Sequence, residues 1–233
     1  MRERIRRLEG RGGGGDGGLP FGLVDIDAAL PGGGLARGAL HALAGERPAV
    51  SGFAAALAAR LAGKEGRVLW CRAGGDLHGP GVAAFGLPPE RLVVARARRP
   101  ADLLWAMEEG LKSRALAAVL GEAESLPPVT ARRLQLAAET GGTPALLLLA
   151  RDQPLPAVTR WRVTAEPSLS ALPGLGPPRW RLELLRCRGG GTGTWILEVS
   201  HGTAGGFALV AGLSDRPADP AVGSPAARHR LAG

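Results

Sequence analysis

The sequence contains no tyrosine, and aromatic residues of all kinds make up only 4% of its 233 residues. It has two cysteines, Cys71 and Cys187. Each lies in an apolar, strand-like segment, so we expect both thiols to be buried and reduced. The four histidines are scattered, and no group of cysteines and histidines has the spacing of zinc ligands. No metal site is therefore predicted.

Long apolar runs are also missing. No segment is long enough to span a bilayer. The first ten residues, Met1–Gly10, are basic, but no apolar region follows them, which excludes a signal peptide. We therefore expect a cytoplasmic protein that makes no contact with membranes.

The residues that are abundant indicate a globular protein with a basic surface. Hydrophobic residues make up 45% of the chain, and the length suits one sizeable α/β domain with tails. The 29 basic residues exceed the 21 acidic ones, giving a formal charge of +8. Such a charge favours a polyanion or an acidic protein as partner. Because arginine greatly outnumbers lysine, a GC-rich genome is an alternative source of this charge.

Strand-like and helix-like segments alternate from Gly38 to Ala150. The expected strands are residues 38–44, 67–71, 91–97, 116–120 and 144–150, and the expected helices are 53–62, 100–114 and 130–140. This order is typical of a parallel sheet flanked by helices. The last of these strands is apolar throughout, which indicates that both of its faces are covered.

The pattern then changes to alternating residues. Thr159–Ala165, Arg179–Cys187 and Thr194–Val199 read as antiparallel strands, and Phe207–Ala211 as one more. We therefore predict an α/β domain over residues 19–213, with a mainly parallel twisted sheet and an antiparallel C-terminal extension. Residues 1–18, basic and then glycine-rich, are expected to be flexible, and residues 214–233 to form a disordered tail.

The first strand and the helix after it have the frame of a phosphate-binding loop, Gly-x-x-x-x-Gly-Lys-Ser/Thr. Counting from Gly45, the second glycine position holds Val50, the lysine position Ser51 and the hydroxyl position Gly52. Val50 adds a branched side chain where backbone should approach phosphate, and neither Ser51 nor Gly52 supplies the expected contact. The segment is interpreted as a degenerate nucleotide loop. An ordinary strand–loop–helix is the alternative.

Several distinctive segments follow one another along the chain. Among them are Leu19-Pro-Phe-Gly-Leu, Gly79-Pro-Gly, Trp105-Ala-Met-Glu-Glu-Gly and Arg179-Trp-Arg-Leu-Glu. In these segments and in their order, the chain resembles the ImuA family of RecA-like inducible mutagenesis proteins. The resemblance covers about Leu19 to Pro217.

This resemblance implies a RecA-like core over residues 19–213. It also implies a role in the DNA-damage (SOS) response, as a non-catalytic accessory factor in translesion DNA synthesis. The implied partners are an inactive Y-family polymerase homologue (ImuB) and an error-prone replicative-type polymerase, with single-stranded DNA and self-association as further candidates. On DNA damage the protein would associate with the nucleoid. A DNA-stimulated ATPase with a non-standard site and a SulA-like cell-division inhibitor are the alternatives.

The departures from RecA argue against catalysis. ATP hydrolysis needs a phosphate loop, an acidic residue on the magnesium ion and a carboxylate that orients water. The position of the RecA glutamate holds Gly74, and the magnesium-side aspartate falls near Gly121. Asp76 and Glu122 are candidate acidic substitutes. We expect no hydrolysis and no cofactor, although the start of the helix after Gly45 still favours an anion.

Arginines supply the candidate contacts with DNA or a partner. In two expected strands a tryptophan stands between two arginines, which places the arginines on one face and the tryptophan on the other. The candidates are Arg160, Arg162, Arg179, Arg181, Arg186 and Arg188 in these strands, and Arg96, Arg98 and Arg99 after the third strand. The alternative is that the tryptophans are core residues and the arginines simply solvated charges.

Overall fold

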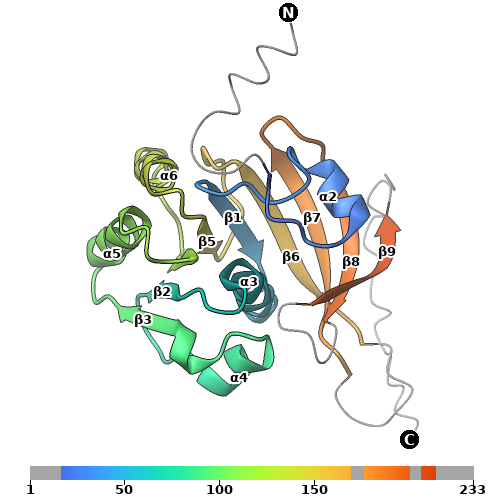
Figure 1. Ribbon diagram of the computed structural model, residues 1–233, viewed down its shortest axis with the longest axis horizontal. Coiled ribbons are helices and arrows are strands. Elements are labelled where there is room, and N and C mark those ends of the chain that lie inside the picture. The colour runs from blue at the N-terminus through green and yellow to red at the C-terminus, as the bar shows by residue number, and fades with distance from the viewer. Residues whose placement is uncertain (1–16, 169–175, 200–205, 214–233) are drawn as a thin grey trace, which may run out of the picture.

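The computed structural model describes residues 17–168, 176–199 and 206–213 (Figure 1). Within these residues nine strands form one sheet, in the order β3-β2-β4-β5-β1-β6-β7-β8-β9. Most of the N-terminus predicted to be flexible, and the whole of the predicted tail 214–233, lie outside the described residues.

The six strands from β3 to β6 in this order are parallel, and β6 to β9 are antiparallel. Their bounds are β1 Leu40–Gly45, β2 Val68–Arg72, β3 Leu92–Arg96, β4 Ala118–Ala123, β5 Ala145–Leu149, β6 Thr159–Glu166, β7 Arg179–Cys187, β8 Gly193–Val199 and β9 Phe207–Leu213. The predicted mainly parallel α/β sheet with an antiparallel C-terminal extension is therefore confirmed.

Helices cover both faces of the parallel part of the sheet, as Figure 1 shows. The helices are α2 Val24–Ala29, α3 Arg47–Ala62, α4 Gly79–Ala84, α5 Pro100–Lys112 and α6 Pro128–Gly141, with a short 3-10 helix at Pro89–Arg91. α5 and α6 pack on one face, and α2, α3 and α4 lie on the other. Among the described residues, no helix has the length and apolar character needed to cross a membrane.

The strand β5 lies between β4 and β1, and every one of its residues is buried. This is the environment predicted from its unbroken apolar sequence. The helix α3 is also buried almost all round, because it lies between the sheet and an aromatic cluster. In that cluster Phe53 is 5.9 Å from Trp180 and 6.4 Å from Phe21, measured between ring centroids. The alanines of α3 let the helix approach the sheet closely.

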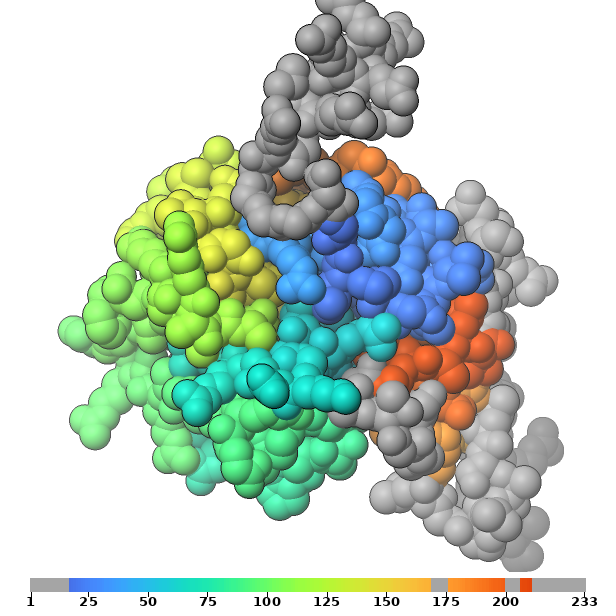
Figure 2. Space-filling view, viewed as in Figure 1, coloured from blue at the N-terminus to red at the C-terminus, as the bar shows by residue number. Residues whose placement is uncertain are grey.

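The segment before α2 reaches across to the end of the sheet. Phe21 lies 6.2 Å from Phe207 of β9. In the space-filling view the blue N-terminal segment correspondingly lies against the red-orange β9 (Figure 2). The N-terminal part of the described chain thus closes the core over the antiparallel extension.

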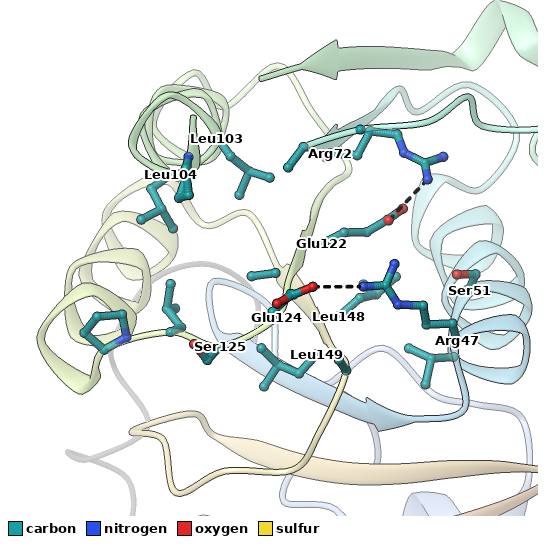
Figure 3. A pocket seen from close by; sticks show the side chains of 18 of the residues that line it. Arg47, Ser51, Arg72, Leu103, Leu104, Glu122, Glu124, Ser125, Leu148 and Leu149 are labelled. Atoms are coloured by element: carbon teal, nitrogen blue, oxygen red, sulfur yellow. Dashed lines mark ion pairs between the residues drawn. The ribbon is translucent and has the colours of Figure 1, made fainter. Parts of the chain in front are cut away.

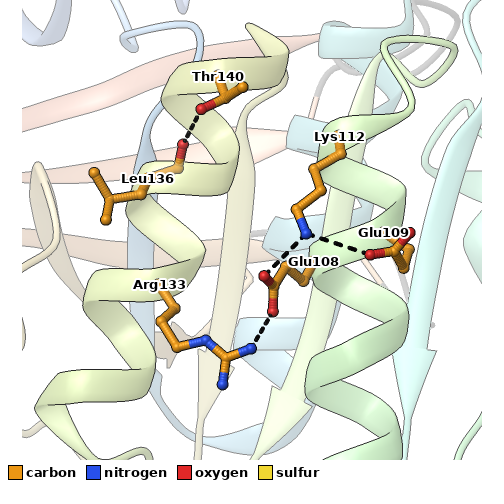
Figure 4. A network of polar contacts seen from close by, with 6 residues as sticks. All are labelled: Glu108, Glu109, Lys112, Arg133, Leu136 and Thr140. Carbon is orange, nitrogen blue, oxygen red and sulfur yellow. Dashed lines mark hydrogen bonds and ion pairs between the residues drawn. The ribbon is translucent and has the colours of Figure 1, made fainter.

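The helices α5 and α6 are joined by a network of charged side chains (Figure 4). Glu108 of α5 accepts from Arg133 of α6 at 2.7 Å and from Lys112 at 3.0 Å. These contacts, Lys112 first, hold the pKa of Glu108 below its usual range. The two helices therefore form one firm layer against the sheet.

The two cysteines are free thiols. Cys71 is fully buried as predicted, and burial raises its pKa to about 12. Cys187 is only half-buried, at the end of β7, so the expectation of full burial is wrong for this residue.

Candidate functional site

A cleft of about 800 Å³ opens at the carboxyl edge of the parallel strands. This is where open α/β sheets bind their ligands. Its lining comes from the ends of β2, β4 and β5, from the first turns of α3 and α5, and from the segment that leads into α6. Figure 3 shows Leu103 and Leu104 of α5 on one side and Arg47 and Arg72 on the other, with Leu148 and Leu149 of β5 below.

The predicted phosphate loop is not a loop in this structure. The strand β1 ends at Gly45 and α3 begins at Arg47, so Glu46 alone connects them. The prediction that the helix begins at Phe53 is wrong. Proline is favoured in the first turn of a helix, and here Pro48 occupies that turn. Since Pro48 also has no N–H, the start of the helix lacks one of the donors that hold an anion.

Gly45 is explained by packing. Its φ is +139°, and a side chain there would meet the carbonyl oxygen of Val163 in the neighbouring strand β6. A glycine is needed at this position whether or not a phosphate binds.

The other positions of the predicted loop lie in the first turns of α3. Val50 is buried at 2% exposure, and Ser51 is half-buried on the wall of the cleft. A Cβ at Gly52 would lie 3.0 Å from Trp180 and 3.2 Å from Phe85. The backbone at Val50, Ser51 and Gly52 is therefore helical and is not part of a loop.

Glu122, one of the two acidic candidates, lies inside the cleft at the end of β4. Trp70 Nε1 donates to Glu122 Oε1 at 2.8 Å, and Arg72 Nη2 lies 3.4 Å from Oε2. The side chains of Arg72 and Glu122 are 15% and 23% exposed. One carboxylate oxygen thus accepts a hydrogen bond, and the other faces a guanidinium in an ion pair. This arrangement disfavours a magnesium ion at Glu122.

Gly121, the position aligned near the magnesium-side aspartate, faces α5. A Cβ there would collide with the Met107 sulfur. The glycine is therefore required by packing between β4 and α5, and no side chain from this position reaches the cleft.

Asp76, the other acidic candidate, does not line the cleft. It forms an ion pair of 2.7 Å with Arg96, and both side chains are largely exposed. The structure therefore does not bring Asp76 and Glu122 together in one site.

An ion pair that was not predicted from the sequence lies across the mouth of the cleft. Arg47 at the start of α3 lies 3.8 Å from Glu124 in the segment after β4. Their side chains are 71% and 88% exposed, so this is a weak and solvated pair. One feature of the sequence could have indicated Arg47 and Glu124. Arg47 begins a helix and Glu124 directly follows a strand, and both positions lie at the carboxyl edge of a parallel sheet.

The arginines on β6 and β7 lie on the same face of the sheet as α5 and α6, in a part that these two helices do not cover. They face carboxylates there. The ion pairs are Arg160–Asp152 at 2.7 Å, Arg162–Glu183 at 2.9 Å, Arg181–Glu166 at 2.7 Å and Arg179–Glu198 at 3.7 Å. The charges of these four arginines are therefore largely neutralised by carboxylates on neighbouring strands and in the segment after β5. The tryptophans between the arginines, Trp161 and Trp180, are core residues with 1% and 4% exposure.

The remaining candidate arginines lie in two places: Arg186 and Arg188 at the end of β7 and just after it, and Arg96, Arg98 and Arg99 at the end of β3 and just after it. Arg186 and Arg188 are exposed, and neither has an ion pair within the described residues. The arginines after β3 lie at the same edge of the sheet as the cleft. There Arg96 pairs with Asp76 and Arg99 with Asp102, whereas Arg98 is exposed without an ion pair to a described residue. The hydrogen bonds from Arg99 lower the pKa of Asp102.

Within residues 17–168, 176–199 and 206–213, no group of three or more His, Cys, Asp or Glu side chains is arranged to hold a metal ion. The cleft is lined by apolar side chains, several of them leucines, and by two arginines and two glutamates.

Comparison with known proteins gives the family. No protein-family model matches the sequence. Protein ImuA from two strains of Caulobacter vibrioides is 37% identical to it over 221 residues. The match covers 84% of this chain and 90% of each relative. At this identity and coverage, the chain belongs to the ImuA family.

Proposed function

We propose that this protein is a non-catalytic accessory factor in DNA-damage-induced mutagenesis, acting in translesion DNA synthesis. Its membership of the ImuA family supports the biological setting. The geometry of the cleft supports the non-catalytic part of the proposal.

The observation that carries this proposal is the connection between β1 and α3, which consists of Glu46 alone. A phosphate-binding loop needs several residues between strand and helix so that their N–H groups can surround the phosphates. The carboxylate that would replace the missing magnesium ligand, Glu122, is already engaged by Trp70 and Arg72. We therefore propose that the protein uses no nucleotide and no other cofactor.

We also propose that the core is RecA-like. Six parallel strands, β3-β2-β4-β5-β1-β6, with helices on both faces and an antiparallel extension beyond them support this assignment. In this proposal the RecA-like core serves as a scaffold that presents surfaces to other proteins. Self-association in the manner of RecA stays a prediction.

The proposed partners are an ImuB-like inactive Y-family polymerase homologue and an error-prone replicative-type polymerase. The formal charge of +8 supports partners that are acidic, and single-stranded DNA is a further candidate. The proposed location is the cytoplasm, with association with the nucleoid after DNA damage.

Mutation frequency after ultraviolet damage tests this function. A strain that lacks the gene is expected to lose induced mutations, and the wild-type gene is expected to restore them. The Glu122→Gln variant should restore them too, because no catalytic carboxylate is involved. Magnesium-dependent release of phosphate from ATP that Glu122→Gln abolishes would show the protein to be an enzyme. Cell lengthening on expression without the partners would instead indicate a division inhibitor.

A further inference from the structure

The cleft at the carboxyl edge has an apolar wall. Leu103 and Leu104 of α5 face it from one side, and Leu148 and Leu149 of β5 from beneath, as Figure 3 shows. Leu126, which leads into α6, completes the wall. A volume of about 800 Å³ lies in the range of sites that enclose a ligand. Aliphatic side chains fit such a wall better than phosphates or ribose do.

The wall is held in place before anything binds. α5 is fixed to α6 by the contacts of Glu108 with Arg133 and Lys112. Leu103 and Leu126 are 2% and 4% exposed, and only Leu104 is half-buried. A rigid apolar wall binds a partner with a smaller loss of entropy than a flexible one does.

The charges that line the cleft are balanced, and arginines without an ion pair to a described residue lie beside the lining residues Pro100 and Ala150. Within the lining, each carboxylate is matched by an arginine: Glu122 by Arg72 and Glu124 by Arg47. Arg98 and Arg151 are additional, exposed, and without an ion pair to any described residue. The charge around the cleft therefore complements an acidic segment.

Of the two arginines that line the cleft, Arg47 is the more available to a partner. Its pair with Glu124 is long, at 3.8 Å, and both side chains are largely exposed. A carboxylate from a partner can replace Glu124 at little cost. Arg72 is different, because it is mostly buried against Glu122.

We propose that this cleft is a docking site for a short segment of a partner protein in which aliphatic side chains alternate with carboxylates. The aliphatic side chains contact the leucine wall, and a carboxylate pairs with Arg47. A second copy of this chain is a poorer occupant, because two molecules with a charge of +8 repel each other. The inference rests on the proposed function, in that the accessory factor acts by holding partners.

Fluorescence polarisation with the full-length protein tests the proposal. The probe is a fluorescein-labelled synthetic peptide of alternating leucines and aspartates. Matched peptides carry serines in place of the leucines or lysines in place of the aspartates. We expect the first peptide to bind and both matched peptides to bind at least about tenfold more weakly.

Matched protein variants locate the binding. Arg47→Glu is expected to weaken binding about tenfold, because attraction becomes repulsion. Arg37→Glu should leave it unchanged, since Arg37 is exposed and precedes β1, at the opposite edge of the sheet. Leu104→Ala should weaken binding, whereas Leu136→Ala, at an exposed leucine on α6, should not. Circular dichroism melting of each variant separates loss of binding from loss of folding.

Three results would overturn the proposal: no binding of the leucine–aspartate peptide, equal binding by the Arg47→Glu and Arg37→Glu variants, or equal binding of the serine peptide. Tighter binding of oligo-dT that Arg47→Glu weakens would also overturn it, and would assign the cleft to nucleic acid. None of these results affects the mutation-frequency test, so failure of this inference is distinguishable from failure of the proposed function.

Discussion

His41 of β1 and Thr159 of β6 share a fully buried hydrogen bond of 2.8 Å between His41 Nδ1 and the threonine hydroxyl. The other ring nitrogen, Nε2, donates to the carbonyl of Ala36 at 2.8 Å. Nδ1 must then accept from Thr159, whose oxygen in turn accepts from Trp161 Nε1 at 2.7 Å. These directed bonds join the two halves of the sheet and require a neutral imidazole.

The stability of the protein should depend on pH through His41. Burial lowers its pKa from 6.5 to about 4, and the bond to Ala36 opposes this only in part. As pH falls, the unfolded chain takes up the proton first. The contribution of neutral His41 is therefore complete above about pH 6.5 and is lost progressively down to about pH 4. The loss approaches about 3 kcal/mol in the free energy of unfolding.

Urea denaturation at a series of pH values measures this dependence. The His41→Gln variant keeps a donor and an acceptor but cannot titrate. It serves as the control, because carboxylates also titrate near the lower end of this range. Parallel curves for the variant and the wild type would contradict the prediction.

Replacing Glu122 should cost much more stability than replacing Glu124. Glu122→Gln leaves Arg72 mostly buried without its counter-charge, which destabilises by about 1–3 kcal/mol. Glu124→Gln breaks only a solvated pair and should change stability by less than about 0.5 kcal/mol. Thermal melting of the two variants, measured side by side, tests whether Glu122→Gln is the less stable. Equal melting temperatures would contradict this prediction.

Gly52→Ala distinguishes a helix at this position from a loop. A methyl group there meets Trp180 and Phe85, so overpacking should cost about 1–3 kcal/mol despite the better helix propensity of alanine. Ser51→Ala, at the neighbouring half-buried position, should be nearly neutral. Chemical denaturation of both variants gives the comparison. A Gly52→Ala protein as stable as the wild type would mean that this part of α3 is not packed as described.

If the protein binds single-stranded DNA, its salt dependence should reveal which arginines take part. Arg98 has no ion pair within the described residues, so Arg98→Gln should reduce the slope of log affinity against log salt by about 1. Arg162 already pairs with Glu183, and Arg162→Gln should leave the slope nearly unchanged. Filter binding at several salt concentrations measures both slopes. A larger effect at Arg162 would restore the strand arginines as the DNA contact.

The sequence was sufficient for the order of elements and for the buried centre of the sheet. The run Ala145–Leu149 predicts a strand that is covered on both faces, because it contains no polar residue. The helix α3 begins at Arg47 and not at the predicted Phe53. The prediction was wrong because Gly45 was read as the first residue of a phosphate loop, which would delay the start of the helix. Proline in the first turn was the signal that pointed to the earlier start.

The arrangement of charges was harder to predict. Arg162 and Glu183 are directly opposite each other only in one register of β6 against β7, and a shift of one residue would turn every side chain to the other face. The pairing of Arg72 with Glu122 depends in a similar way on β2 lying beside β4. The sequence predicts that Glu122 lies just after a strand, but it does not predict that Arg72 lies beside it.

The direct passage from β1 through Glu46 into α3 limits what substitutions at this junction can change. Writing the motif glycine, lysine and threonine into positions 50–52 would alter side chains on a formed helix without creating a loop. A loop at this junction requires an insertion, and an aspartate at Gly121 would also require a smaller residue than Met107. Changes in length and compensating substitutions would have to occur together. Substitutions at positions 50–52 alone therefore do not convert this strand–helix junction into a phosphate-binding loop.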